Sequence, residues 1–285
     1  MSAVTADERA APVSQRPAAH APRKRWTRFI LPVYSILMIV YLTSPVLTMI
    51  LYGFNDIPGE RQTPKFWGFT LHWYRDLFGV AGLTPAFEHS ITIAIPSAVV
   101  ATILGTLIGL ALGRYSFKGR APTNFVIFLA IAVPEIVLGS SLLAMFVLIE
   151  APLGYSSILV SHIGFSIAFV AVTVRARVQG LDRSLEDAAQ DLFANPVTAF
   201  FRVTLPLIAP GIVAGGLLAF VLSLDDFVIT NFVSGQFQTF PIWVYGATRI
   251  GLPPQVNVMG TLLFMTGVIF AVANVVLQRR RAAAA

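Results

Sequence analysis

The sequence has 285 residues, of which 56% are hydrophobic and only 12% are Asp, Glu, Lys or Arg. Soluble domains carry roughly 25% charged residues, so this chain has too few of them to cover a water-exposed surface. It contains no cysteine, which excludes disulfide frameworks, thiolate zinc sites and cysteine nucleophiles. The composition therefore predicts an integral membrane protein.

Six apolar segments are long enough to cross a bilayer as helices, because about 20 helical residues cover the roughly 30 Å of its hydrocarbon core. In chain order they span about 30–51, 90–112, 125–149, 158–177, 211–233 and 257–278. The sequence predicts an all-α, polytopic membrane fold with one six-helix transmembrane domain over residues 29–279.

The basic residues predict how the chain is oriented. With the N-terminus in the cytoplasm, 16 of the 20 Lys and Arg residues fall on the cytoplasmic side of the predicted spans. This positive-inside bias places both termini in the cytoplasm. It also accounts for the net charge of +6, so we expect contact with the lipid bilayer and none with nucleic acid. Residues 1–28 are predicted to be a disordered basic cytoplasmic arm, and residues 280–285 a cytoplasmic tail.

The loop over residues 181–205, between the fourth and fifth spans, carries signals for two short helices. Ser184 and Asp187 have the spacing of a capping box, and Asn195-Pro196 indicates an N-cap followed by proline at the first helical position. A helix this short is marginally stable in water, which favours a docking partner at the inner face of the membrane. A solvated connecting loop is the alternative.

This loop resembles a motif of ABC-importer permeases. Glu186-Asp187-Ala188-Ala189-Gln190-Asp191-Leu192, followed by Phe201-Arg202-Val203-Thr204-Leu205-Pro206-Leu207, is similar to the "EAA" loop of that family. In the family this loop sits in a groove of the ATPase subunit. The resemblance implies that an ATPase is contacted by Glu186, Asp187, Ala188, Ala189, Asp191, Leu192, Phe193 and Ala194.

Phe193 departs from the family pattern, which usually has glycine at this place. Glycine permits a left-handed turn between the two short helices, whereas phenylalanine makes that turn costly. Two outcomes are open. Either the turn adopts a right-handed geometry, or Phe193 fills an apolar notch in the ATPase.

The chain has no nucleotide-binding motif of its own. Its lysines, Lys24, Lys65 and Lys118, do not lie in a phosphate-binding G-x-x-x-x-G-K-S/T loop. We therefore expect ATP and Mg²⁺ to be bound by a separate ATPase subunit. In this chain we expect no cofactor, no metal and no catalytic residue.

Three carboxylates interrupt the predicted spans, namely Glu135, Asp225 and Asp226. A charge near the bilayer centre costs about 2.5–3.5 kcal/mol on insertion scales, and no Lys or Arg within the spans offsets it. An acidic lining suits a cationic substrate, to which Phe227 and Trp243 add cation–π attraction if they face the path. The alternative is that these carboxylates are protonated or paired with an arginine of another subunit.

Two other features lie within the spans. His162 is expected to be a hydrogen-bonded packing residue in preference to a proton relay or a substrate ligand. Gly105, Gly109 and Gly113 form a small-residue stripe, which predicts a close helix contact within the chain or to a second permease.

Further segments look like the spermidine/putrescine permeases of the PotC/PotI type. They are Phe54-Asn55, Ala132–Val137, Ser161–Phe165, Ser223–Gly235 and Pro253–Asn257. The resemblance implies a type I ABC-importer permease fold in the bacterial inner membrane and polyamine uptake. It also implies a second homologous permease, an ABC ATPase dimer and an external substrate-binding protein. The alternatives are an importer for an amino acid derivative, phosphate ester or sugar, and an ion-coupled carrier or channel.

Overall fold

The computed structural model describes residues 27–59, 61–182 and 184–284, and its ordered elements are helices. No strand is present in these ranges, where one isolated β-bridge joins Asn55 and Phe69. The expected all-helical fold is confirmed for this part of the chain. Residues 1–26, which make up most of the predicted cytoplasmic arm, lie outside the described residues, as does residue 285 of the predicted tail.

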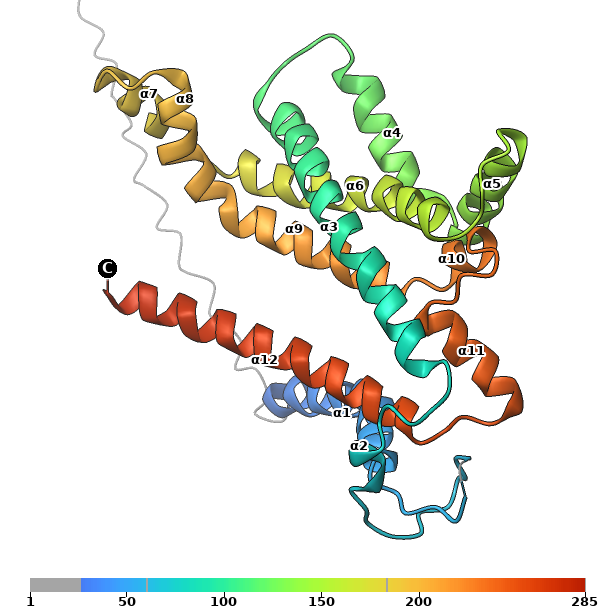
Figure 1. Ribbon diagram of the computed structural model, residues 1–285. Helices are drawn as coiled ribbons and strands as arrows, with labels where there is room; N and C mark the ends of the chain where they lie inside the picture. Colours follow the sequence, from blue (N-terminus) through green and yellow to red (C-terminus); the bar gives the residue numbers. More distant parts are fainter. Residues whose placement is uncertain (1–26, 60, 183, 285) are drawn as a thin grey trace, which may run out of the picture.

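The first half of the chain forms α1 (Thr27–Tyr52), α2 (His72–Arg75), α3 (Leu83–Arg114), α4 (Arg120–Ala132), α5 (Glu135–Leu148) and α6 (Tyr155–Gln179). The second half forms α7 (Ser184–Asp191), α8 (Pro196–Ala199), the π-helix η1 (Phe200–Thr204), α9 (Leu205–Asp225), α10 (Val228–Val233), α11 (Phe240–Ile250) and α12 (Gln255–Ala284). In Figure 1, α3, α6 and α9 lie together, and α7 and α8 project beyond one end of α9. The last helix, α12, extends into residues 280–284, where the sequence predicts a tail.

Four helical segments are long and apolar enough to cross a membrane: Phe29–Tyr52, Leu83–Arg114, Tyr155–Gln179 and Pro196–Asp225. The bent pair α4–α5 makes a fifth if it is counted as one span. A shorter apolar stretch, Gln255–Ile269, lies in α12. The described residues thus contain four to five helices that can span a membrane.

The prediction of one continuous helix over residues 125–149 is wrong. The segment is divided into α4 and α5, which are bent by 107° at the break. Pro134 causes this break, because proline lacks an amide hydrogen and clashes with the preceding helical turn. Val133 adopts the extended conformation that the residue before a proline prefers (φ −68°, ψ 129°).

The helix expected over residues 211–233 is also interrupted. The long helix α9 ends at Asp225, Asp226 is extended (φ −64°, ψ 118°), and α10 begins at Val228. No proline lies at this break. Instead, the Asp226 carboxylate accepts the Thr230 amide at 2.7 Å and so caps the start of α10.

Glycines allow α3, α6 and α9 to pack closely. A Cβ atom at Gly105 would lie 2.6 Å from the Val170 Cβ of α6, and one at Gly109 would lie 2.8 Å from the Ala171 carbonyl oxygen. From α9, Gly215 packs against the same Val170. The small-residue stripe of α3 therefore makes a contact within the chain, which settles the choice that the sequence left open.

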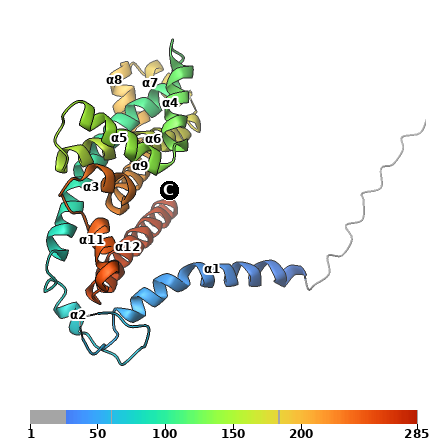
Figure 2. The same ribbon diagram turned by 90° about the vertical axis from the view of Figure 1, so that its right-hand side faces the viewer.

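The first helix stands apart from this core. Figure 2 shows α1 extending away from the rest of the chain, with its C-terminal end beside α12, against which it packs. None of the residues in its most apolar window is buried. The apolar side chains of α1 are thus available to lipid or to another subunit.

Candidate functional site

The turn after α7 is left-handed. Phe193 has φ +63°, the Ala194 amide donates to the Ala189 carbonyl at 3.1 Å, and the Phe193 amide donates to the Gln190 carbonyl at 2.9 Å. These two bonds are those of a Schellman motif, in which glycine normally occupies the left-handed position. The right-handed turn is therefore excluded, and Phe193 holds a backbone conformation that costs a residue with a Cβ roughly 1–2 kcal/mol.

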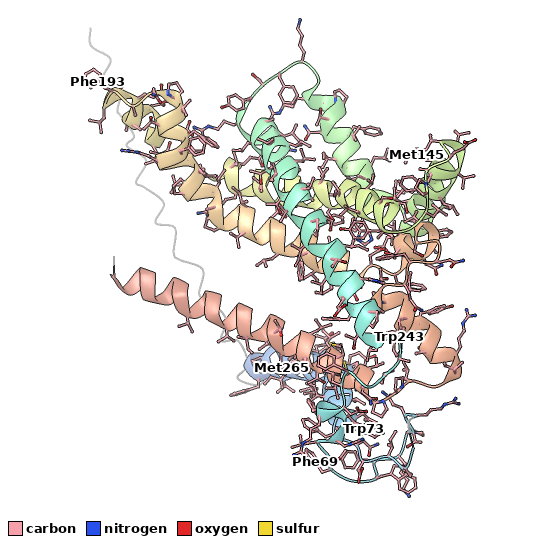
Figure 3. The ribbon with its side chains drawn as sticks, in the orientation of Figure 1. Phe69, Trp73, Met145, Phe193, Trp243 and Met265 are labelled. Atoms are coloured by element: carbon pink, nitrogen blue, oxygen red, sulfur yellow. The ribbon has the colours of Figure 1, made fainter. Side chains whose placement is uncertain are left out.

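The Phe193 ring lies at the free end of the loop between α7 and α8, as Figure 3 shows. Its exposed fraction is 99%, and that of the neighbouring Leu192 is 82%. Two large apolar side chains are thus presented together on a strained turn. An exposed apolar patch of this kind is typical of a contact with another protein.

Glu186 points back to its own chain. Its carboxylate forms an ion pair with Arg114 at the end of α3 and accepts a hydrogen bond from the Thr204 hydroxyl of η1. Asp187 and Asp191 are exposed on α7. Glu186 therefore connects α7 to two transmembrane helices, α3 and the start of α9. The exposed carboxylates of Asp187 and Asp191 are the ones accessible to a partner.

The remaining candidate residues of the loop are the small ones. Ala188 is exposed, whereas Ala189 and Ala194 are half-buried. The predicted Asn195 cap is present, since its side chain accepts the Thr198 amide at 2.7 Å with proline at the first helical position.

The start of α7 is stabilised differently from the predicted capping box. Asp182 accepts the Ser184 amide at 3.0 Å. This hydrogen bond lowers the pKa of the exposed Asp182 carboxyl below its usual value. The sequence correctly predicts that a helix begins at Ser184, but the acceptor at its start is the carboxylate of Asp182.

The three carboxylates of the apolar segments lie at helix ends. Glu135 is exposed and is the first residue of α5, directly after the break at Pro134. Asp225 is exposed and is the last residue of α9. The Asp226 side chain is only 5% exposed. Helix breaks within the two predicted continuous spans therefore position all three carboxylates.

Asp226 has a partner within the chain. Its Oδ2 atom lies 3.2 Å from His162 Nε2, in a part of the core where the His162 side chain is 1% exposed. The search of the sequence for Lys and Arg missed this pairing, because the partner is a histidine 64 positions earlier on another helix. The expectation that His162 is a hydrogen-bonded packing residue is consistent with this contact.

The two aromatic candidates lie in different surroundings. Phe227 packs on Tyr245 of α11 with ring centroids 4.7 Å apart. Trp243 packs against a buried cluster that includes Trp73 and Leu83, and Figure 3 places it beside the start of α3.

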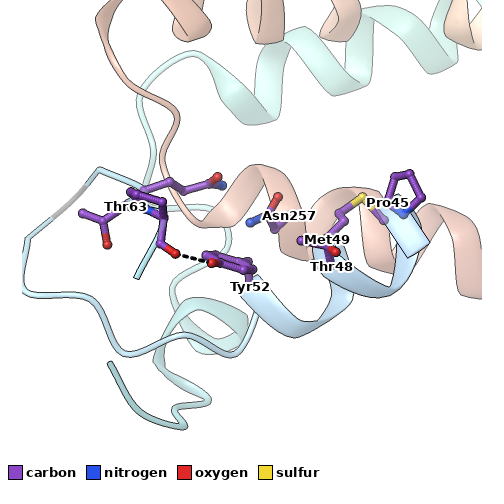
Figure 4. A pocket seen from close by; sticks show the side chains of 8 residues that line it. Pro45, Thr48, Met49, Tyr52, Thr63 and Asn257 are labelled. Carbon is purple, nitrogen blue, oxygen red and sulfur yellow. Dashed lines mark hydrogen bonds between the residues drawn. The ribbon is translucent and has the colours of Figure 1, made fainter. Parts of the chain in front are cut away.

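A separate cavity of about 440 Å³ lies between α1, the loop after it and the start of α12. Figure 4 shows Thr48, Met49, Tyr52 and Asn257 around it, with the Tyr52 hydroxyl donating to the Pro64 carbonyl. Its lining has no charged side chain, so it does not match the acidic residues expected for a cation. Within the described ranges, no group of three His, Asp or Glu residues could hold a metal ion.

A glycine-packed core of apolar helices, several of them long enough to span a bilayer, is the arrangement of a helical membrane protein. The family model for the "binding-protein-dependent transport system inner membrane component" matches residues 105–282, and the chain belongs to this family. The chain is therefore an inner membrane component of a bacterial ABC transport system. The resemblance noted in the sequence is confirmed.

Its relatives include two polyamine permeases. The spermidine/putrescine transport system permease protein PotC of Escherichia coli K12 is 37% identical over 240 residues, covering 84% of this chain and 90% of PotC. The putrescine transport system permease protein PotI of the same strain is 37% identical over 249 residues, covering 85% of this chain and 86% of PotI.

Among solved structures, one chain of a bacterial ABC transporter involved in the import of the acidic polysaccharide alginate has the same fold. The TM-score is 0.61 at 16% identity, and the match covers 91% of this chain and 99% of the other. At this identity the likeness concerns the fold alone.

Proposed function

We propose that this chain is the transmembrane permease subunit of an ATP-driven ABC importer that takes up polyamines such as spermidine and putrescine. The observation that carries the proposal is the 37% identity to both PotC and PotI, whose names state these substrates. The fold by itself leaves the substrate open, because an alginate transporter shares it.

Six crossings with both termini in the cytoplasm form the topology of the proposal. The crossings would be α1, α3, the pair α4–α5, α6, α9 and α12. The lengths and composition of four of these helices and of the bent pair support it, and so does the excess of basic residues on one side. Residues 1–28 and 280–285 would then lie on the cytoplasmic side.

The proposal includes three kinds of partner. A second homologous permease would cover the apolar face of α1, which this chain leaves unburied. An ABC ATPase dimer, which binds ATP and Mg²⁺, would receive the loop carrying Leu192 and Phe193. An external binding protein would deliver the solute. This chain would form and break no covalent bond.

The acidic residues fit a cationic solute. Protonated amines form charge-assisted hydrogen bonds with carboxylates, which offset part of the cost of a charge in the membrane. The exposed Asp225 and Glu135 are available for such bonds. Phe227, close to Asp225 in sequence, would add cation–π attraction to the bound amine, and so would Tyr245, on which its ring packs.

The test is uptake by the reconstituted complex. The complex isolated through this chain, placed in proteoliposomes with ATP and its binding protein, should accumulate radiolabelled putrescine. Liposomes with this chain alone are the control and should show no flux. Unaided flux through the single chain would favour a carrier or channel, and ATP-driven uptake of a different solute would overturn the polyamine assignment.

A further inference from the structure

A buried polar network lies where α6 meets the break between α9 and α10. At its centre, His162 Nδ1 lies 2.7 Å from Ser223 Oγ, and Nε2 lies 2.9 Å from Thr230 Oγ1 and 3.2 Å from Asp226 Oδ2. Ser97 of α3 donates to Ser223 at 2.9 Å. The network therefore joins α3, α6, α9 and α10.

The members of the network are shielded from solvent. The exposed fractions are 1% for His162, 4% for Ser223, and 0% for Thr230 and Ser97. A polar group at such depth is stable only when its hydrogen bonds are made, because desolvation otherwise costs about 1–3 kcal/mol. The arrangement of donors and acceptors is thus closely constrained.

An imidazole that accepts at Nδ1 and donates from Nε2 fits these contacts, with the Nε2 proton shared between Thr230 Oγ1 and the Asp226 carboxylate. In that tautomer Ser97 donates to Ser223, Ser223 donates to His162 Nδ1, and Nε2 donates to the Asp226 carboxylate. The tautomer is inferred from these partners. Asp226 also accepts the hydroxyl and the amide of Thr230, each at 2.7 Å. Since its Oδ1 atom also accepts the Ile229 amide at 3.4 Å, this carboxylate receives four donors inside the helix bundle.

The neighbouring Asp225 is in the opposite situation. It is exposed, and it makes no hydrogen bond or ion pair with the described residues. Asp225 is the last residue of α9 and is exposed, whereas Asp226 lies in the extended break, where its carboxylate enters the network. The two carboxylates therefore have different surroundings although they are adjacent in sequence.

We propose that His162 is a positioning residue, which holds Asp226 inside the helix bundle so that, of the two adjacent aspartates, only Asp225 presents its carboxylate to the transported cation. Asp226 then has a structural role, because it caps α10 and stabilises the break between α9 and α10, next to which Asp225 lies. The inference rests on the proposed polyamine transport only for the identity of the cation.

The natural sequence has no cysteine, so single cysteines can report the accessibility of each position in the complete complex. The probe is a membrane-impermeant trimethylammonium methanethiosulfonate. Asp225→Cys should react at least tenfold faster than Asp226→Cys. Gln236→Cys, exposed in the turn after α10, is the control that should react equally in all backgrounds.

Substitution of His162 tests its role. His162→Phe keeps a ring but has no donor, and it should slow the reaction of Asp225→Cys at least fivefold. His162→Gln keeps an N–H donor and should stay within twofold of the parent. If His162→Phe does not assemble, Thr230→Val removes one donor to Asp226 at nearly constant volume and should slow the same reaction about threefold.

Two results would overturn the inference: equal rates for the two aspartate positions, or an unchanged rate at position 225 in the assembled His162→Phe or Thr230→Val complex. Failure of the reconstituted wild-type complex to take up putrescine, with the pattern of rates intact, would contradict the proposed substrate and leave the role of His162 standing.

Discussion

The Phe193→Gly substitution separates the strain of the turn after α7 from the ATPase contact that we propose for the Phe193 ring. The backbone at this position is left-handed (φ +63°) and the ring is 99% exposed. Glycine adopts this conformation without a Cβ penalty. In the chain without its ATPase, removal of the ring therefore loses no packing.

The expected magnitudes follow from these two facts. Relief of the left-handed penalty, roughly 1–2 kcal/mol, less the extra chain entropy of glycine, about 0.5–1 kcal/mol, stabilises the free loop by about 1 kcal/mol. Burial of a phenylalanine ring in an ATPase pocket contributes about 1.5–3 kcal/mol. The strain is present in the free and the bound loop, so it cancels from the dissociation constant. The ATPase should bind the glycine variant roughly 30-fold more weakly, at 1.4 kcal/mol per tenfold.

The assay is the affinity of the isolated ATPase for the permease pair in nanodiscs, together with hydrogen exchange at the turn. Phe193→Ala is the matched control, because it removes the ring but keeps a Cβ in the strained backbone. Both variants should weaken ATPase binding to a similar extent, and only the glycine variant should increase protection of the Ala194 amide. Wild-type ATPase affinity in both variants would refute the proposed contact of the Phe193 ring with the ATPase. Unchanged protection of the Ala194 amide in the glycine variant would refute the backbone strain at Phe193.

Three further substitutions have defined outcomes. Glu186→Gln removes an ion pair that joins α7 to the transmembrane helices, worth about 1–3 kcal/mol, so ATP hydrolysis should continue with less solute imported per ATP; an unchanged ratio would contradict the coupling role. Gly105→Ala places a Cβ 2.6 Å from Val170, and overpacking of about 1–3 kcal/mol should lower the melting temperature. Gly164→Ala meets open space and replaces a helix-interior glycine, so it should not lower the melting temperature. The pKa of Asp182 is lowered by its hydrogen bond, so the stability that it gives α7 is present above pH 3.8 and is lost as pH falls further. Asp182→Asn should abolish this pH dependence in amide exchange at the start of α7, and persistence of the dependence would assign it to another group.

Local signals in the sequence located much of the fold. Apolar runs predicted where the long helices lie, and the Asn195 cap and its following proline predicted the second short helix of the loop. Such features depend on neighbours within one or two turns. The break at Pro134 was also visible in the sequence, but the long apolar run around it favoured one helix over two.

Long-range contacts could not be predicted in this way. The pairing of His162 with Asp226 joins α6 to the end of α9, and that of Glu186 with Arg114 joins α7 to the end of α3. No local pattern states which polar side chains meet after folding. The break at Asp226 is likewise invisible, because it depends on a capping bond and the buried histidine, and no helix-breaking residue marks it.

The glycine contacts that hold α3, α6 and α9 together have a mechanical consequence. Because these helices interlock without space for even a methyl group at Gly105, we expect them to move as one rigid body. At 1.5 Å per residue, α9 is about 30 Å long, with the loop that carries α7 and α8 at one end and the break at Asp226 at the other. A tilt of α9 by a few degrees, caused by a force on Glu186, would displace its other end at Asp225 by a few ångströms. A displacement of this size is enough for a carboxylate to gain or lose contact with an amine.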